Sequence, residues 1–211
     1  MPIKKHNPYQ IVKMFEEEIA AYTGAKYAVT VDSCTNALFL VCKYLEVKEV
    51  TIPSETYLSV PMSIIHAGGE VIFDKTSSTN HWKGVYQLKP YPIYDAAKRF
   101  TSDMYIEGSL MCLSFHIKKL LNIGKGGAIL TDSKEAYDWF KKARYEGRGE
   151  VFYKEDNIET LGWNMYMTPQ QAAHGLCLMQ NHPLHSEDQG EHNGYRDLTE
   201  FPVFKDCKTK E

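Results

Sequence analysis

Small hydroxyl and thiol side chains form a turn between a predicted strand and a predicted helix. The turn, SCT at 33–35, follows the β-prone run 26–31 and precedes the apolar, helix-forming stretch 37–45. Unpaired backbone N–H groups at the start of a helix favour an anion, so this turn could hold a phosphate. Ser33 or Thr35 could equally serve as a simple helix cap.

A carboxylate and a pair of lysines follow two later strands. Asp95 ends the run PIYD, and open α/β sheets present ligand-binding groups at the carboxyl ends of their strands. This carboxylate could pair with a protonated ring nitrogen, or it could cap a helix. Lys118 and Lys119 come soon after an apolar run that ends at Phe115. A partly buried lysine can lose its charge and attack a carbonyl, whereas two surface lysines would only be solvated.

Strands and helices alternate around these groups. The first helical pattern ends at Gly24, and a capping-box pattern at Asp132 and Glu135 opens a helix that Gly147 closes. Further helices are expected at 37–45, 59–66 and 168–180, and strands at 26–31, 49–52, 70–73, 92–95, 110–115 and 128–131. We expect a loop with at most one weak strand over 74–91. The alternation predicts an α/β fold with a mixed, mostly parallel central sheet and helices on both faces.

The composition is that of an ordinary globular protein, with 211 residues, 43% of them hydrophobic and 24% charged. Basic residues number 24 and acidic residues 27, with no long basic run, so we expect no nucleic-acid partner. The 5 cysteines are scattered without a CxxC pair, which favours free thiols in a reducing compartment. The sequence contains neither a signal-like start nor an apolar stretch of membrane-spanning length. We therefore expect a cytoplasmic protein with no membrane partner.

The end of the chain is polar, and its few apolar residues are irregularly spaced. We expect one domain over residues 1–180 and a polar C-terminal tail over 181–211 that forms no independent domain. His182, His185 and His192 in this tail could suggest a metal site. Histidines in polar tails are more often solvent-exposed, so no metal is predicted.

Six segments, in order, resemble the DegT/DnrJ/StrS family of nucleotide-sugar aminotransferases, which share the aspartate-aminotransferase fold. They comprise residues 24–38, 53–57 with 66–74, 94–97, 114–119, 126–132 and 162–173. The resemblance implies the large domain of an enzyme that uses pyridoxal 5'-phosphate (PLP). It also implies a shortened version, because the family's longer connection before the Asp95 segment and its C-terminal small domain have no counterpart here.

The resemblance implies roles for the matching residues. Lys119 would form a Schiff base with the cofactor aldehyde and then transfer a proton. Asp95 would keep the ring nitrogen protonated, and Tyr57 would stack against the ring. The phosphate would be held by Ser33, Cys34, Thr35 and Ser114.

Other positions bear on the partner subunit and on departures from the family pattern. Asn164 matches an asparagine that reaches the phosphate of the neighbouring subunit, which implies a homodimer with shared active sites. Lys98 stands where the family often has histidine or glutamine near the cofactor, and it could compete with Lys119 or bind a substrate phosphate. Cys34 replaces a frequent glycine and Tyr166 a frequent arginine.

Lysine at position 119 favours transamination, because some relatives with histidine there dehydrate sugars instead. We therefore expect a PLP-dependent aminotransferase of amino-sugar biosynthesis. It would move an amino group from an amino acid, with glutamate as the expected donor, to a nucleotide-linked ketosugar. One alternative is a noncatalytic or degenerate PLP-binding or dimeric interaction protein. Another is an unrelated α/β phosphate-binding domain, which would form no bond to PLP.

Overall fold

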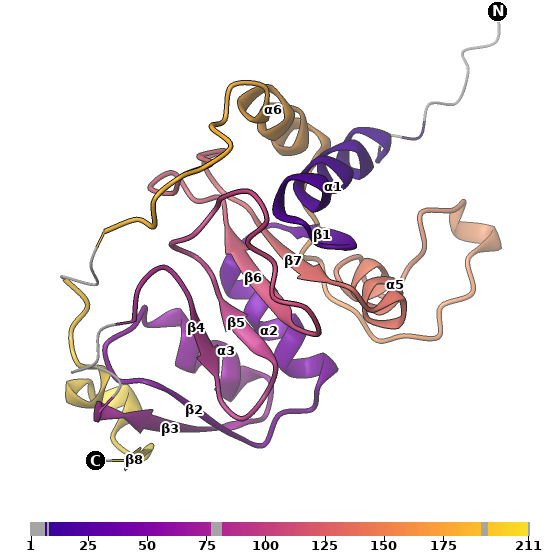
Figure 1. Cartoon of the computed structure of the whole chain (residues 1–211). Helices are drawn as coiled ribbons and strands as arrows, with labels where there is room; N and C mark the ends of the chain where they lie inside the picture. The colour runs from indigo at the N-terminus through magenta and orange to yellow at the C-terminus, as the bar shows by residue number, and fades with distance from the viewer. Residues whose placement is uncertain (1–6, 8, 77–81, 191–193, 211) are drawn as a thin grey trace, which may run out of the picture.

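The computed structural model describes residues 7, 9–76, 82–190 and 194–210 (Figure 1). Its helices are α1 (Gln10–Thr23), α2 (Cys34–Tyr44), α3 (Ser59–His66), α5 (Lys134–Ala143) and α6 (Pro169–Met179). The strands are β1 (Tyr27–Val31), β2 (Glu49–Pro53), β3 (Glu70–Asp74), β4 (Tyr86–Leu88), β5 (Ile93–Asp95), β6 (Leu110–Ser114), β7 (Gly127–Thr131) and β8 (Lys208–Lys210). Short 3-10 helices span Tyr153–Glu155, Leu198–Glu200 and Pro202–Phe204.

The strands form a five-stranded sheet in the order β1-β7-β6-β5-β4 and a parallel three-stranded sheet in the order β2-β3-β8. Two hydrogen bonds between the backbones of Thr51 and Lys89, of 2.8 and 3.0 Å, join β2 antiparallel to the end of β4. When strand directions are traced through this junction, β4 and β7 run in the opposite direction to all the other described strands. The predicted mixed sheet is therefore confirmed, although β5 and β6 form the only parallel pair among the described strands of the five-stranded sheet. It is divided into two sheets because the short β4 contributes only a narrow link.

Helices cover both faces of the five-stranded sheet, as predicted. Alternate side chains of β6 face opposite sides, so Leu110 and Cys112 pack in one core and Met111 and Leu113 in the other. The first core lies against α2, α3 and α5, and the second lies against α1 and α6, which are side by side in Figure 1. This sandwich holds the carboxyl ends of β5 and β6 next to the start of α2.

The helix starts follow local capping chemistry. Thr168 and Gln171 form the predicted capping box of α6, with the Thr168 N–H donating to Gln171 Oε1 at 2.9 Å. The N-cap of α5 lies one residue later than predicted. Ser133, not Asp132, is the N-cap, because its hydroxyl accepts a hydrogen bond from the Ala136 N–H at 3.2 Å.

The chain beyond α6 runs along one side of the molecule to β8 (Figure 1). Its apolar residues are few, but Leu198 and Phe204 are buried in the same core as α2 and α3. Its last strand, β8, pairs with β3. The described part of the tail therefore packs onto the body of the protein, and the division into 1–180 and 181–211 stays a prediction.

The tail histidines lie apart from any described metal-binding group. The His182 ring packs against Tyr22 and Phe100, and His185 Nδ1 is 3.1 Å from the Ser102 hydroxyl. His192 lies outside the described residues. Within the described ranges, no three or more His, Cys, Asp or Glu side chains come together as a metal-binding group would require.

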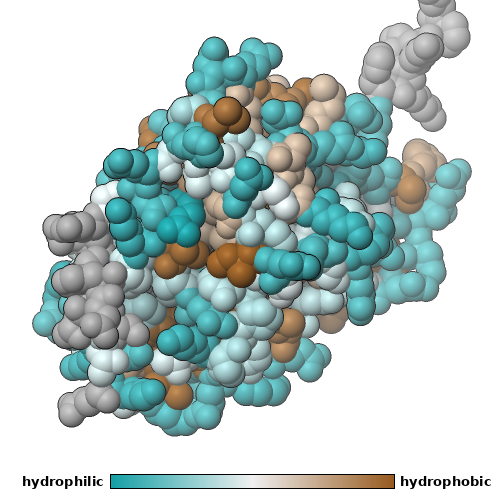
Figure 2. Space-filling model, in the orientation of Figure 1, coloured by the Kyte–Doolittle hydropathy of each residue, from teal (hydrophilic) through white to brown (hydrophobic). Residues whose placement is uncertain are grey.

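The face of the molecule in Figure 2 is mostly hydrophilic, with hydrophobic residues alone or in small groups. In the part of the chain that the structure describes, every helix is too short or too polar to cross a membrane.

Candidate active site

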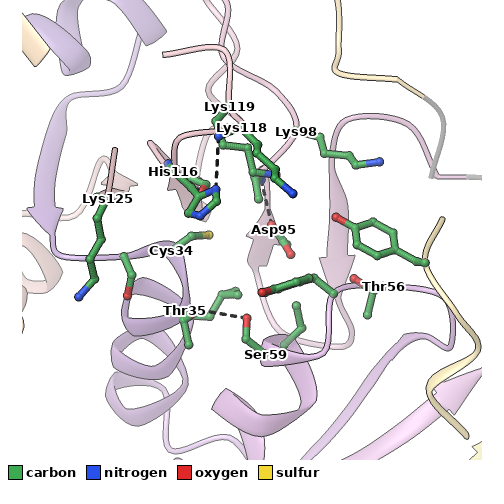
Figure 3. A pocket seen from close by; sticks show the side chains of 18 of the residues that line it. Cys34, Thr35, Thr56, Ser59, Asp95, Lys98, His116, Lys118, Lys119 and Lys125 are labelled. Carbon is green, nitrogen blue, oxygen red and sulfur yellow. Dashed lines mark hydrogen bonds between the residues drawn. The ribbon is translucent and has the colours of Figure 1, made fainter. Parts of the chain in front are cut away.

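A cavity of about 370 Å³ lies between the start of α2, the ends of β5 and β6, and the tail. This volume is within the range of small-molecule binding sites. Most of the predicted site residues line it (Figure 3), namely Ser33, Cys34, Thr35, Tyr57, Asp95, Lys98, Ser114 and Lys119. Residues that lie far apart in the sequence are therefore brought to one cavity, and Asp95 and Lys119 share it.

Asp95 is held in a fixed orientation at the end of β5. Its side chain is buried, and Oδ1 accepts a hydrogen bond from the Ala97 N–H at 2.9 Å while Oδ2 accepts one from the Tyr86 hydroxyl at 3.0 Å. Burial raises the pKa of Asp95, whereas these two hydrogen bonds and the charge of Lys119 act in the opposite direction. The result is a buried hydrogen-bond acceptor at the cavity wall.

Lys119 lies in the loop that follows β6. The loop is closed by backbone hydrogen bonds, including that from the Lys119 N–H to the His116 carbonyl at 2.8 Å. Both Lys118 and Lys119 line the cavity, so lining alone does not separate them. Their electrostatic effects differ, because burial raises the pKa values of Asp95 and of the Cys34 thiol and the charge of Lys119 opposes both shifts. Lys119 is thus the lysine whose charge acts on the centre of the site.

The start of α2 forms one wall of the cavity, and a helix start is a place where backbone N–H groups can bind an anion. Ser33 is the N-cap and its hydroxyl accepts a hydrogen bond from the Asn36 N–H at 3.2 Å. Cys34 and Thr35 occupy the first turn, where backbone N–H groups have no acceptor within the helix, and both residues line the cavity. Ser33 therefore caps the helix without removing the anion site, so the two interpretations of this turn are compatible.

Close packing against β7 holds this helix start in place. A Cβ atom at Gly127 would lie 2.6 Å from the backbone nitrogen of Cys34. Only glycine leaves room for this approach. The Thr35 hydroxyl donates to Ser59 Oγ at 3.0 Å, which ties the same turn to α3.

Several cations surround the cavity and complement an anionic ligand. Besides Lys119, the lining includes Lys118 and Lys125, with the Lys125 Nζ atom 3.2 Å from Asp32 Oδ2. Lys98 lies over aromatic rings, with its Nζ atom 4.8 Å from the ring centroid of Tyr195. Burial and the charge of Lys119 lower the pKa of Lys98.

Several lining residues were not predicted from the sequence, chiefly Trp82, Tyr195, Thr56 and Lys125. Trp82 lies in the irregular connection before β4 and Tyr195 in the polar tail, where no periodicity marks a position as functional. Their rings stack at a centroid distance of 6.1 Å, and the Tyr57 ring is 6.3 Å from that of Tyr195. The concentration of aromatic residues in these segments was the only available signal.

Asn164 is the predicted site residue that does not line the cavity. Its side-chain amide donates to Glu146 Oε1 at 3.2 Å, and its backbone bridges to that of Tyr145. A residue that serves the neighbouring subunit would lie outside the cavity of its own subunit. The contacts with Glu146 and Tyr145 would also suit a purely structural residue. Its role therefore stays a prediction.

The side chains present fit PLP. The cofactor needs an amine for its aldehyde, a carboxylate for its ring nitrogen, an aromatic surface for its ring and an anion site for its phosphate. Lys119, Asp95 and Tyr57 supply the first three, and the start of α2 supplies the fourth. Tyr57 is 53% exposed, so its ring is accessible to a ligand.

Comparisons with known proteins identify the family of this chain. The sequence model of the DegT/DnrJ/EryC1/StrS aminotransferase family matches residues 4–81 and 103–193. The spore coat polysaccharide biosynthesis protein SpsC of Bacillus subtilis (strain 168) is 29% identical over 78% of this chain and 55% of its own length. GDP-perosamine synthase of Escherichia coli O157:H7 is 25% identical over 80% of this chain and 57% of its own. The chain thus spans little more than half the length of these relatives.

Solved structures show the same fold. AtS13 from Actinomadura melliaura superposes with a TM-score of 0.69 at 19% identity, covering 81% of this chain and 60% of AtS13. The family match includes every predicted site residue except Asp95 and Lys98, which lie in the unmatched segment 82–102 and are placed at the cavity by the fold. Because the match extends over most of the sequence and the fold agrees, the chain belongs to the DegT/DnrJ/EryC1/StrS aminotransferase family.

Proposed function

We propose that this protein is a PLP-dependent aminotransferase that moves an amino group from an amino acid to a nucleotide-linked ketosugar, with glutamate as the expected donor. The observation that carries the proposal is the common cavity of Lys119 and Asp95 beside the start of α2. The substrate class is supported by relatives such as GDP-perosamine synthase, whose name identifies a nucleotide-sugar enzyme. The cations and aromatic rings at the cavity suit a substrate that carries phosphate.

Lys119, Asp95, Cys34 and Thr35 each have a defined task in this proposal. PLP, when bound, supplies the electron sink that makes amino-group transfer feasible. The Lys119 Nζ atom would hold the cofactor and, when free, would carry a proton to and from the reacting carbon. The Asp95 carboxylate accepts the hydrogen bond of the ring N–H. The N–H groups of Cys34 and Thr35 bind the phosphate.

The test uses the visible absorbance that PLP gains when it bonds to a lysine. The purified full chain should develop this band, and Lys119→Ala should abolish it. Lys118→Ala is the matched control, because this neighbouring lysine also lines the cavity, and it should keep the band. Added glutamate should bleach the band of the wild-type protein.

The outcomes separate the possible functions. A band that no amino donor discharges would support a noncatalytic PLP-binding protein instead. Absence of the band in the wild-type chain would overturn PLP binding altogether. If glutamate bleaches the band, a screen of nucleotide-linked ketosugars for restoration of absorbance would identify the amino acceptor.

We also propose that two copies form a homodimer in which Asn164 of each serves the other's site. The placement of Asn164 outside its own cavity supports this arrangement. Light scattering should give the mass of two chains. Mixing Lys119→Ala protomers with Asn164→Ala protomers should restore activity, since one site of each mixed dimer then keeps both residues. No recovery in demonstrated mixed dimers would exclude shared sites.

The proposed location is the cytoplasm. The described cysteines are all free thiols, which supports a reducing compartment. Cell fractionation with an epitope-tagged chain would test this.

A further inference from the structure

A chain of buried hydroxyl groups ends on Asp95. The Tyr86 hydroxyl lies 2.6 Å from the Thr56 hydroxyl and 3.0 Å from Asp95 Oδ2. Because an ionised carboxylate can only accept, Tyr86 donates to Asp95 and the Thr56 hydroxyl donates to Tyr86. All three side chains are buried, with exposed fractions of 2% for Thr56, 7% for Tyr86 and 6% for Asp95.

The register of the sheet brings Tyr86 and Asp95 into contact. In the antiparallel pair β4 and β5, Tyr86 lies directly opposite Asp95, and residues in that relation place their side chains on the same face. Strand β4 belongs to segment 82–102, which the family model does not match.

The two hydrogen bonds to Asp95 use different oxygens. Ala97 N–H occupies Oδ1 and the Tyr86 hydroxyl occupies Oδ2, so the plane of the carboxylate is set from both sides. Hydrogen bonds donated to a carboxylate favour its charged form and oppose the effect of burial. Without the tyrosine, the Ala97 N–H and the charges of Lys119 and Lys98 would be left to counteract desolvation.

We propose that Tyr86, itself held by Thr56, is a positioning residue that keeps the Asp95 carboxylate ionised and aimed at the cofactor ring nitrogen. The inference rests on the proposed function for the identity of the ligand. The effect of Tyr86 on the ionisation of Asp95 is a property of the cofactor-free protein. It can therefore be measured separately from cofactor binding.

Other titratable groups also act on Asp95 and must be considered in any titration. Those whose charges interact with it are Lys98, Lys119, Cys34, Cys112, Tyr86 and Tyr195. Burial raises the pKa of the Tyr195 hydroxyl to about 12 and those of the two thiols and of Tyr86 well above their usual values. The two thiols and the two tyrosines therefore stay neutral while Asp95 titrates.

The first experiment follows the Asp95 carboxyl by carbon NMR in the cofactor-free protein. Tyr86→Phe should raise the pKa of Asp95 by about one unit, since a hydrogen bond to a charged group is lost. Tyr91→Phe is the matched control, because the Tyr91 hydroxyl only accepts a hydrogen bond from the Lys48 N–H at 2.8 Å. It should leave Asp95 unchanged.

The second experiment measures PLP dissociation constants at neutral pH. Tyr86→Phe should weaken PLP binding about tenfold, the ratio expected for one charge-assisted hydrogen bond. A PLP analogue with carbon in place of the ring nitrogen should bind the wild-type and Tyr86→Phe proteins equally. That analogue isolates the ring-nitrogen contact from any general damage to the cavity.

The results distinguish this inference from the proposed function. If PLP binds at Lys119 but Tyr86→Phe changes neither the Asp95 pKa nor PLP affinity, the positioning role is wrong and the proposed function stands. If the wild-type chain does not bind PLP, the proposed function fails, and so does the ring-nitrogen assignment. Should Tyr86→Phe not fold, Thr56→Val provides the second variant. It should shift the Asp95 pKa in the same direction by a smaller amount, and no shift would overturn the inference.

Discussion

The Arg99 guanidinium holds both carboxylate oxygens of Asp188, with its Nε and Nη2 atoms each 2.7 Å from an oxygen. This bidentate pair ties the segment after α6 to the turn that carries Asp95 and Lys98. Next to it, the Gln189 N–H donates to the Lys98 carbonyl at 2.8 Å. The tail that contributes Tyr195 to the cavity is thus anchored beside the predicted catalytic residues.

Breaking this anchor should loosen the tail. Asp188→Asn removes the charge from a partly buried bidentate pair, and we expect a loss of about 1 kcal/mol in the free energy of unfolding. Limited proteolysis after α6 should become faster. The control is Glu200→Gln, which affects the exposed pair with Arg196 at 3.3 Å and should change neither quantity measurably. Equal effects of both substitutions would contradict a specific anchor.

A buried carboxylate should make stability depend on pH. Burial opposes ionisation of Glu16, but Arg144 and Lys141 lower its pKa below the ordinary 4.5. Since the folded-state pKa is the lower one, this stabilisation is complete above about pH 4.5 and is lost as pH falls through the folded-state value. Glu16→Gln should therefore cost about 3 kcal/mol at neutral pH and progressively less in acid.

Urea unfolding at a series of pH values would measure this dependence. Glu17→Gln is the matched control, because the neighbouring Glu17 is exposed and pairs with Lys13 at 3.6 Å on the helix surface. It should change stability by less than about 0.5 kcal/mol. A constant difference between wild type and Glu16→Gln down to low pH would contradict the assignment.

Glycine should be required where β7 meets α2. In Gly127→Ala the new methyl group would lie 2.6 Å from backbone atoms of Ser33 and Cys34, which cannot move without shifting the helix start. We expect a loss of about 2 kcal/mol in stability, together with weaker PLP binding. At Gly126 the nearest atoms are the ends of the Ile123 and Met167 side chains, at 2.7 and 2.9 Å.

Those side chains can rotate away, so Gly126→Ala is the control and should have the smaller effect. Chemical denaturation and PLP titration of both variants would measure the difference. A larger loss in Gly126→Ala than in Gly127→Ala would show that the helix start is not the critical contact.

The cysteines should differ strongly in reactivity. Burial raises the pKa of the Cys42 thiol to about 12, and Cys112 is also buried, whereas Cys177 is exposed on α6. Because the thiolate is the reactive form, iodoacetamide at neutral pH should modify Cys177 first. Mass spectrometry of peptides would locate the modification. Labelling of Cys42 before Cys177 in the folded protein would contradict the packing of α2.

The sequence by itself determined the order of most strands and helices, β8 excepted, and the local position of the main chemical groups. The turn at 33–35, Asp95 and Lys119 were identifiable because each follows a strand whose signals lie within a few neighbouring residues. Capping at Thr168 was equally local and was predicted correctly. Such features depend on hydrogen bonds and periodicity along one segment.

Only the tertiary structure decided which distant residues meet. The contact of Tyr86 with Asp95 requires the register of β4, and the stacking of Tyr195 on Trp82 requires the tail to fold back over the cavity. Neither segment has a periodic pattern, because so few of its residues face a core. The inverted directions of β4 and β7 likewise follow from pairing with neighbouring strands, since burial and sheet hydrogen bonds, rather than local propensity, select those partners.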